Sequence, residues 1–582
     1  MQSALDLANS GFKVYLVEET TAIGGRMSQL DKTFPTNDCS MCMISPKLIE
    51  VEKHNNIELI TNAQIEALEG EEGNFQIKVS KKPRYVNEEK CSGCGDCVEA
   101  CPVTLINEFE EGLNTRKATY KRYPQAIPSA MTISKTNRPP CKLSCPAGCN
   151  GQGYVALISQ GKYVEAVNHI KQWIPLPASL GRICHHPCEL QCNRSEVDKP
   201  VGIAPLKRFV ADTVRKQRDE GLIPPEEIAA IDLSKPRVAV VGSGPSGLTC
   251  AADLSKRGYP VTIFEAGSKP GGQLQLTIPE YRLPKDILAA EIQDIIDAGI
   301  ELELNTSIGK DTPLDDLKAK GYQAIYLAIG AQKSTSLSIP GEDSPEVLPA
   351  LDFLRDINSG KEIKIGKRVI VTGGGNVAMD TARTARRLGA EEVSIIYRRT
   401  EAEMPARLEE VEDAREEGIK FRFLTNPKKF LSNDNKHLVG VECNEMELGE
   451  PDESGRRRPI AKPETFTIDC DTVIVAIGQS TNLAVMLGDT KIKTKPNSFI
   501  SVERVTLATD EPGIFAGGDG VTGPKSAVEA INHGHEAAIS IERYLTGADL
   551  REGREKPKEE PAPLPEGEHD KKERIYTKKI SL

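Results

Sequence analysis

Short apolar runs alternate with segments of helical periodicity from residue 237 to about residue 545. Runs such as RVAVV and RVIVT predict buried strands, and the segments between them predict crossover helices. We therefore expect parallel sheets of the α/β class. Residues 141–220 have helical periodicity instead. Residues 1–30 predict a helix, a strand and a turn, and NIELI and NFQIKVS predict further short strands.

One segment of the chain occurs twice. GFKVYLVEETTAIGGRM starts at Gly11 and GYPVTIFEAGSKPGGQL starts at Gly258, which indicates a duplicated structural unit. Continued backwards, the alignment brings Met1 opposite Leu248, just after the glycine-rich turn of the second copy. We therefore expect the first copy to lack its phosphate loop. Either the chain is cut at its start, or this copy is a degenerate nucleotide-binding fold.

Composition narrows the classes of function. The 582 residues suit about three to five domains, and 38% hydrophobic and 27% charged residues are usual for soluble globular proteins. A net charge of −11 and a single Trp argue against nucleic-acid binding. No apolar run reaches the roughly 20 residues of a membrane span, and the first residues do not resemble a secretion signal. Twelve of the 15 Cys precede residue 193. In a cytoplasmic chain such clusters favour metal binding over disulfides.

The first nucleotide motif is RVAVVGSGPSGLTCAADLSKRGYPVTIFE, which predicts a strand, a glycine turn, a helix and a second strand. Gly242 permits the tight turn, Gly244 lets the backbone approach a pyrophosphate, and Gly247 allows close helix–strand packing. The start of the helix supplies N–H groups for phosphate. Glu265 ends the second strand, where a carboxylate can bind ribose hydroxyls. This context favours a dinucleotide site over a bare tight turn.

The second motif, KRVIVTGGGNVAMDTARTARRLGAEEVSIIYRRT, repeats this order. Its second strand ends in Arg398 and Arg399 rather than in an acidic residue. Two guanidinium groups favour the 2′-phosphate of NADP, whereas NAD requires a carboxylate for its ribose. A solvated basic pair is the alternative interpretation. Asn376 and Val377 open the helix, near the expected phosphates.

A third glycine-rich segment, GIFAGGDGVTGPKSAVEAINHG, predicts a strand that ends before Asp519 and a helix that follows. With the phrases IPEYRLPK and YRRTEAEMPA, it makes residues 141–545 resemble the small subunit of glutamate synthase. The segment is also similar to the matching part of dihydropyrimidine dehydrogenase and to ferredoxin:NADP transhydrogenases. The resemblance implies FAD, NADPH and 4Fe-4S clusters as cofactors. It also implies hydride transfer from NADPH to the flavin, followed by single-electron transfer to the clusters.

The same resemblance implies a discontinuous FAD domain, with the NADP domain inserted between LAIGAQ and VAIGQS. It implies that Gln273 and Arg282 lie near the flavin. The predicted FAD-binding residues are Gly242, Gly244, Pro245, Ser246, Gly247, Glu265, Gly272, Gln273, Arg282, Gly330, Gly518 and Asp519. The predicted NADP-binding residues are Gly373, Gly375, Asn376, Val377, Arg398, Arg399 and Gly478.

Two sets of cysteines are candidate iron–sulfur ligands. In the first, CSGCGDCVEACP has the C-x2-C-x2-C-x3-C-P pattern of bacterial ferredoxins, with zinc as the alternative. The second set, CKLSCPAGC with CHHPCELQC, resembles the helical iron–sulfur domain of the glutamate synthase family. Its six thiols can supply all the ligands of one cluster, or the ligands of two clusters if a residue other than Cys also binds iron. The alternative interpretations of this set are a zinc site and a purely structural role. Lys207 stands where dihydropyrimidine dehydrogenase has a Gln ligand. The predicted metal ligands are Cys91, Cys94, Cys97, Cys101, Cys141, Cys145, Cys149, Cys184, Cys188 and Cys192.

Residues 1–130 resemble a different family, the A-type subunits of heterodisulfide reductase. GGRMSQLDKTFPTNDCSMCMISPKLIEV and KKPRYVNEEKCSGCGDCVEACP carry this resemblance. It implies a cytosolic flavin and iron–sulfur protein. In that family's setting Cys39 and Cys42 are candidate cluster ligands; the alternative is that both are buried thiols that bind no metal.

We predict an NADPH-dependent FAD iron–sulfur oxidoreductase of the cytoplasm. Its cofactors carry the chemistry, so no side chain need act as acid or base. The partner is a redox protein or subunit: ferredoxin, a heterodisulfide reductase-type protein or the glutamate synthase large subunit. The alternatives are the glutamate synthase small subunit proper and a non-catalytic electron-transfer subunit with a vestigial flavin site. The predicted domains are 1–85, a partial nucleotide fold; 86–140, ferredoxin-like; 141–235, helical iron–sulfur; 236–355 with 475–550, FAD-binding; 356–474, NADPH-binding; and 551–582, a disordered tail.

Overall fold

The computed structural model divides into two compact units, Met1–Arg138 and Pro139–Leu582. Pro102 of the ferredoxin pattern and parts of the predicted tail lie outside the described residues. The described residues are 1–101, 103–135, 137–224, 230–434, 437–451, 455–483, 490–495, 498–555, 559–564 and 569–577.

The first unit begins with the helix, strand and turn that the sequence predicts. Its core strands β1 and β2 pair in parallel, and α2 crosses between them. Leu5 and Leu48 are fully buried between these helices and strands. The elements are α1 (Gln2–Asn9), β1 (Val14–Glu18), α2 (Ser40–Lys53), β2 (Ile57–Thr61), β3 (Ala63–Glu71), β4 (Asn74–Lys81), α3 (Asp96–Glu99), β5 (Thr104–Ile106), β6 (Thr115–Lys117), β7 (Thr119–Tyr120) and β8 (Thr132–Ile133).

The sequence repeat is also a structural repeat. Helix α1 and strand β1 match α10 (Pro245–Lys256) and β10 (Val261–Phe264) of the second unit. The two following glycines adopt the same left-handed backbone in both copies. Gly24 and Gly25 have φ of 113° and 58°, and Gly271 and Gly272 have φ of 124° and 55°. The duplicated sequence therefore forms the same strand and glycine turn twice.

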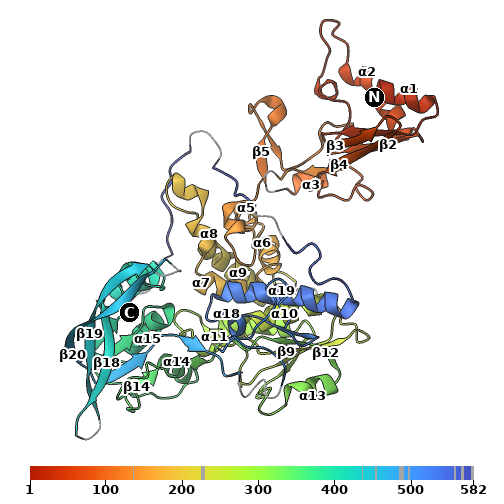
Figure 1. The fold of residues 1–582 in the computed structure, drawn as a ribbon. Helices are drawn as coiled ribbons and strands as arrows, with labels where there is room; N and C mark the ends of the chain where they lie inside the picture. Colours follow the sequence, from red (N-terminus) through yellow and green to blue (C-terminus); the bar gives the residue numbers. More distant parts are fainter. Residues whose placement is uncertain are drawn as a thin grey trace. The chain divides into compact units, whose positions relative to one another are not determined.

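The second unit contains a parallel sheet with the strand order β11-β10-β9-β12-β23, which we call the sheet of the outer domain. Helices α10 and α19 lie side by side on one face, and α13 covers the other (Figure 1). A Cβ on Gly534 would lie 2.5 Å from the Ser246 carbonyl oxygen, so only glycine allows this helix contact. The remaining bounds are β9 (Arg237–Val241), β11 (Glu301–Glu303), α13 (Leu314–Ala319), β12 (Tyr322–Leu327), β23 (Ile514–Ala516), α18 (Asp519–Thr522) and α19 (Ala527–Thr546).

A second parallel sheet, with the order β14-β21-β15-β16-β17, belongs to what we call the inserted domain. The chain enters and leaves this domain through β13 (Lys333–Ser334) and β22 (Gln479–Ser480), which pair antiparallel. An antiparallel meander, β18-β19-β20, adjoins the sheet. The bounds are β14 (Val347–Pro349), α14 (Ala350–Asn358), β15 (Arg368–Thr372), α15 (Asn376–Arg387), β16 (Glu392–Ile396), α16 (Leu408–Glu416), β17 (Lys420–Arg422), β18 (Thr425–Ser432), β19 (Leu438–Pro451), β20 (Arg457–Asp469) and β21 (Thr472–Val475).

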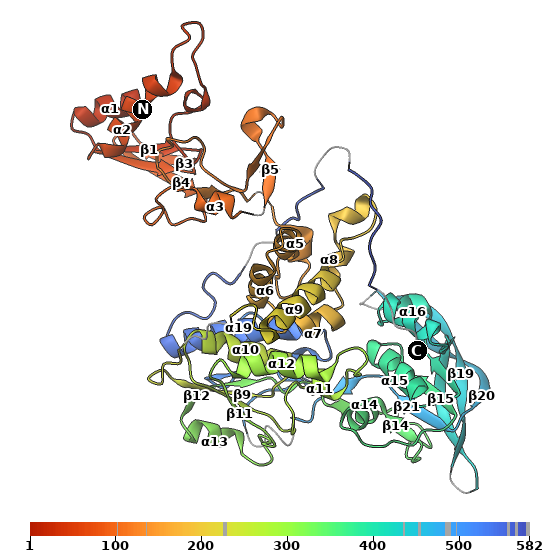
Figure 2. The same cartoon turned by 180° about the vertical axis from the view of Figure 1, so that it is seen from behind.

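Helices of the segment 140–219 pack on the outer domain (Figure 2). The buried carboxylate of Glu291, on α12 (Lys285–Ile296), accepts the N–H groups of Ala178 at 2.6 Å and Ser179 at 2.8 Å. It thereby satisfies free N–H groups at the start of α7. In the predicted tail, Arg574 lies 2.7 Å from Glu189. These helices are α4 (Pro140–Leu143), α5 (Gly151–Ser159), α6 (Tyr163–Lys171), α7 (Pro177–Ile183), α8 (Pro187–Leu190) and α9 (Ile203–Asp219).

The predicted α/β class is confirmed by the two parallel sheets. Among the described residues, no helix has the length and apolar character needed to cross a membrane.

Candidate functional site

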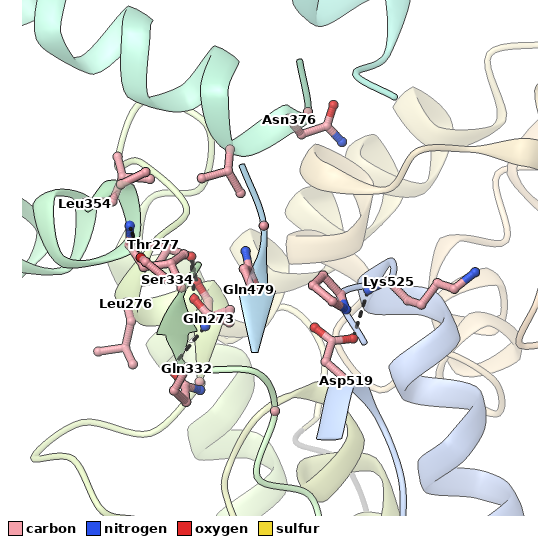
Figure 3. A pocket seen from close by; sticks show the side chains of 18 of the residues that line it. Gln273, Leu276, Thr277, Gln332, Ser334, Leu354, Asn376, Gln479, Asp519 and Lys525 are labelled. Atoms are coloured by element: carbon pink, nitrogen blue, oxygen red, sulfur yellow. Dashed lines mark hydrogen bonds between the residues drawn. The ribbon is translucent and has the colours of Figure 1, made fainter. Parts of the chain in front are cut away.

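A cavity of about 1800 Å³ lies between the outer and inserted domains (Figure 3). Its wall includes both glycine-rich turns. The structure brings together every predicted nucleotide-binding residue except Gly247 along this wall. In the sequence these residues lie in two separate motifs, in a third segment and at single positions between them. The structure makes them one site.

The first glycine turn combines tight packing with an open face. A Cβ on Gly242 would lie 2.5 Å from the Ala328 carbonyl oxygen, and a Cβ on Gly247 would lie 1.9 Å from the Gly242 carbonyl oxygen. In contrast, a Cβ on Gly244 would meet no atom within 4 Å, because this glycine faces the cavity. The turn and the first N–H groups of α10 therefore fit a pyrophosphate.

Glu265 lies beside this turn, just after strand β10. Its carboxylate accepts the N–H groups of Ser243 at 3.1 Å and Gly267 at 2.7 Å. These bonds fix the carboxylate at the cavity wall, at the place where a dinucleotide fold binds a ribose.

The second glycine turn, in the inserted domain, is packed in the same way. A Cβ on Gly373 would lie 2.2 Å from the Ala476 carbonyl oxygen, and a Cβ on Gly374 would lie 2.6 Å from the Tyr397 ring. The Asn376 side chain accepts the N–H of Arg407 at 3.0 Å, which holds the loop before α16 against the start of α15.

The predicted arginine pair divides into two different environments. Arg398 is exposed and lines the cavity. Arg399 is only 8% exposed, and its Nε donates to the Arg457 carbonyl oxygen at 2.8 Å. Arg398 is therefore available to a charged ligand, whereas Arg399 also builds the wall.

Gln273 and Arg282, the two residues predicted near the flavin, both line the cavity. The Gln273 amide donates to the Ala331 carbonyl and to Gln332, each at 3.1 Å, and accepts from Thr277 at 2.7 Å (Figure 3). The Arg282 guanidinium is paired with buried carboxylates of the inserted domain.

Asp519 lies at the start of α18, after strand β23 of the outer domain. Its carboxylate accepts the Lys525 N–H at 3.1 Å (Figure 3). Burial raises the pKa of Asp519 to about 7. The carboxyl group is thus poised between its neutral and charged forms near neutral pH, beside the first glycine turn.

The second cysteine set borders this nucleotide cavity. Cys184 and His185, which follow α7, form part of the cavity wall. The Cys184 sulfur accepts the N–H of His186 at 3.4 Å. The Nδ1 atom of His185 is buried and has no hydrogen-bond partner within the described chain. The sequence alone gives no sign that these cysteines approach the glycine turns.

The first cysteine set lies in the other unit. Cys91 accepts the Met131 N–H at 3.4 Å, whereas Cys94 and Cys97 are exposed. Across the described residues, no three His, Cys, Asp or Glu side chains converge on the position of a single metal ion. A 4Fe-4S cluster binds each of its thiolates to a different iron and does not need such convergence.

The cavity wall also contains polar residues that were not predicted from the sequence. Lys525 lies within the phrase AGGDGVTGPKSAVEAI, and Arg407 directly follows YRRTEAEMPA. Their place in these phrases was a usable signal. Gln332, which ends the phrase LAIGAQ, also lines the cavity, as do Asn426, Arg456 and Asn482, which lie in none of the phrases quoted above.

Comparison with known families agrees with this geometry. The pyridine nucleotide-disulphide oxidoreductase family matches residues 236–534. The chain belongs to this family. The family described as dihydropyrimidine dehydrogenase domain II, 4Fe-4S cluster, matches residues 110–219, and the 4Fe-4S binding domain family matches residues 84–106. The predicted cofactors FAD, NADP and 4Fe-4S clusters are thereby confirmed.

Curated relatives share most of this region. The chain is 44% identical over 427 residues to the NADP(+)-dependent formate dehydrogenase subunit beta of Moorella thermoacetica, covering 70% of this chain and 60% of that one. It is 39% identical to the NADPH-Fe(3+) oxidoreductase subunit beta of Geobacter sulfurreducens, covering 70% and 63%. The chain thus spans less than two thirds of either relative.

The predicted resemblance to the glutamate synthase small subunit is confirmed. The chain is 33% identical to the glutamate synthase [NADPH] small chain of Escherichia coli K12, covering 72% of this chain and 92% of that one. It therefore also belongs to the family of this small chain. The resemblance of residues 1–130 to the A-type subunits of heterodisulfide reductase stays a prediction.

Proposed function

We propose that this chain passes electrons from NADPH, through FAD and 4Fe-4S clusters, to a partner redox protein. The observation that carries the proposal is the shared cavity, because both glycine turns and Cys184 form its wall. A nicotinamide, a flavin and a cluster ligand can all reach one space there.

The residues have separate tasks in this proposal. The turn at Gly244 and the carboxylate of Glu265 hold the pyrophosphate and ribose of FAD, and Asp519 faces the same ligand. The turn at Gly375 holds the pyrophosphate of NADPH, and Arg398 binds its 2′-phosphate. Bound flavin supplies the chemistry of accepting a hydride and releasing single electrons. The chain itself orients the two nucleotides.

The partner is the less specific part of the proposal. The two relatives described above are named as beta subunits, one of a formate dehydrogenase and one of an Fe(3+) oxidoreductase. Their names support a catalytic subunit of a redox complex as the partner. The clustered cysteines, which form no disulfide among the described residues, support a cytoplasmic location. The glutamate synthase large subunit is the second candidate, supported by the small-chain match.

The test is an anaerobic titration of the reconstituted full chain with NADPH, followed by visible and electron paramagnetic resonance spectra. Flavin bleaching followed by cluster signals is the expected result. If dithionite reduces both cofactors and NADPH reduces neither, the proposed route is wrong. If the folded chain holds no flavin, it is instead an electron-transfer subunit with a vestigial flavin site.

A further inference from the structure

The helical segment 140–219 is fixed to the outer domain at two separate helices. Glu291 of α12 accepts two N–H groups at the start of α7, as described above. On α19, the Nε2 atom of His535 lies 2.9 Å from the Trp173 carbonyl oxygen, and its Nδ1 atom lies 2.6 Å from the Asp253 carboxylate. Because these contacts lie on different elements, they hold the helical segment in one orientation on the outer domain.

The inserted domain is joined to the outer domain by a narrow connection. The chain enters and leaves through the antiparallel pair β13 and β22, and the Thr335 N–H continues this pairing with a bond to the Gly478 carbonyl oxygen at 3.1 Å. Two adjacent crossings form a single hinge, and a hinge permits one domain to turn against the other. A contact between the inserted domain and the helical segment would restrict this turning.

Arg407, which directly precedes α16 of the inserted domain, makes such a contact. Its Nη1 atom donates to the Cys184 carbonyl oxygen at 3.2 Å, and its Nη2 atom lies 2.7 Å from Nε2 of His186. Because a guanidinium has only donors, the His186 nitrogen that faces it must accept. The Glu409 carboxylate pairs with the same guanidinium, and the Arg407 side chain is only 19% exposed. One largely buried cation therefore joins the inserted domain to the helical segment.

The backbone of Arg407 bonds to the second glycine turn. Its N–H donates at 3.0 Å to the side chain of Asn376, the first residue of α15, and both residues line the nucleotide cavity. This backbone bond lies within the inserted domain, whereas the side-chain bonds cross to the helical segment. If the inserted domain turned away, the backbone bond would move with it and the side-chain bonds would break.

We propose that Arg407 is a positioning residue that holds the inserted domain against the helical segment and so keeps the two nucleotide turns facing each other across the cavity. The inference rests on the proposed function, because hydride transfer from NADPH to flavin, which carries two electrons, requires this alignment. Such a transfer needs the reacting atoms of the two bound nucleotides to be about 3–3.5 Å apart. Arg407 acts through the position of the domain and not by contact with the reacting atoms.

Amide hydrogen exchange at the hinge tests the proposal without any electron transfer. In the reconstituted full chain without NADPH, Arg407→Met should make exchange faster at residues 333–335 and 478–480, because the hinge opens more often. Arg415→Met is the matched control, since Arg415 lies on α16 of the same domain and pairs with the exposed Glu401. This control should exchange like the unaltered chain. Unchanged hinge exchange in Arg407→Met would overturn the proposal. If Arg407→Met does not fold, Arg407→Gln provides the same comparison.

Anaerobic stopped-flow measurements separate alignment from binding. In Arg407→Met the dissociation constant of NADPH should stay near that of the unaltered chain. The rate constant for flavin reduction at saturating NADPH should fall about ten- to a hundredfold, since a misplacement of about 1 Å can cost this much. Arg407→Lys keeps the charge but loses the fork of two donors, so it should recover only part of the rate.

Two further outcomes distinguish the alternatives. A large loss of NADPH affinity in Arg407→Met with unchanged hinge exchange would show that Arg407 is a nucleotide ligand, which would overturn its role as a positioning residue. If NADPH reduces no flavin in the unaltered chain, the proposed function fails. The hinge exchange then still decides whether Arg407 holds the inserted domain.

Discussion

The guanidinium of Arg282 lies 2.6 Å from the carboxylate of Asp380, and the two residues belong to different domains of the nucleotide cavity. Arg282 precedes α12 in the outer domain, and Asp380 lies on α15 in the inserted domain. The side chains are 10% and 4% exposed, and Glu410 is a second buried partner of Arg282. This buried network links the two domains beside the space that the two nucleotides share.

Arg282→Met should therefore destabilise the chain. The substitution leaves Asp380 and Glu410 buried without their cation, and breaking a buried pair in this way costs about 3–5 kcal/mol. The measurement is the free energy of unfolding in urea. Lys318→Met is the control, since it removes an exposed partner of Glu511 and should cost about 0–1 kcal/mol. Equal, small losses in both variants would contradict a structural role for the Arg282 network.

Arg398→Ala should weaken NADPH binding about ten- to a hundredfold and leave NADH binding nearly unchanged. The expected loss is that of a charge-assisted hydrogen bond to a phosphate that NADH lacks. Arg399→Ala should instead lower stability, because this buried side chain bonds to the Arg457 carbonyl. Dissociation constants for both nucleotides and a thermal melt separate these effects. Parallel losses for NADPH and NADH in Arg398→Ala would refute the 2′-phosphate assignment.

The glycine turns could be predicted from the sequence because each lies in a strand–turn–helix pattern that is complete within one short segment. A Cβ on Gly247 would meet the carbonyl oxygen of Gly242, five residues earlier, so the residue type records a contact inside the motif itself. The alternation of strands and helices was equally visible, since each parallel strand is buried on both faces. These local rules were enough for the fold class and for the two glycine turns in the cavity wall.

Other features depend on residues far apart in the chain. The pairing of Arg282 with Asp380 joins two elements that no local pattern relates, so the resemblance could name Arg282 as a candidate flavin neighbour but could not find its partner. Arg398 and Arg399 are identical in type, and only the structure shows that Arg399 is buried and bonds to β20 whereas Arg398 is exposed. The burial of Lys207, on α9, is likewise a result of helix packing.

Gly244→Ala should leave the fold intact and prevent flavin binding. No atom of the chain lies within 4 Å of the added methyl group, so any loss arises from the ligand that needs this space. Gly247→Ala is the contrasting variant, because its methyl group would lie 1.9 Å from a backbone oxygen and should disrupt the turn itself. After reconstitution, the absorbance of bound flavin measures flavin content and circular dichroism measures folding in each of the two variants. Full flavin content in Gly244→Ala would contradict the proposed pyrophosphate site.

The raised pKa of Asp519 predicts how the stability of the flavin-free protein depends on pH. Burial raises its pKa from 3.8 to about 7, so the folded chain holds this proton more tightly than the unfolded chain. The bound proton therefore stabilises the fold fully when the pH is below 3.8, the pKa of this carboxyl group in the unfolded chain. This stabilisation is lost as the pH rises through about 7, the pKa in the folded chain. Asp519→Asn removes the titration and should therefore lose less thermal stability than the unaltered chain between about pH 5 and pH 8. Asp315→Asn, at an exposed position on α13, is the control and should follow the unaltered chain. Identical pH profiles for all three proteins would show that Asp519 is not buried in the way described.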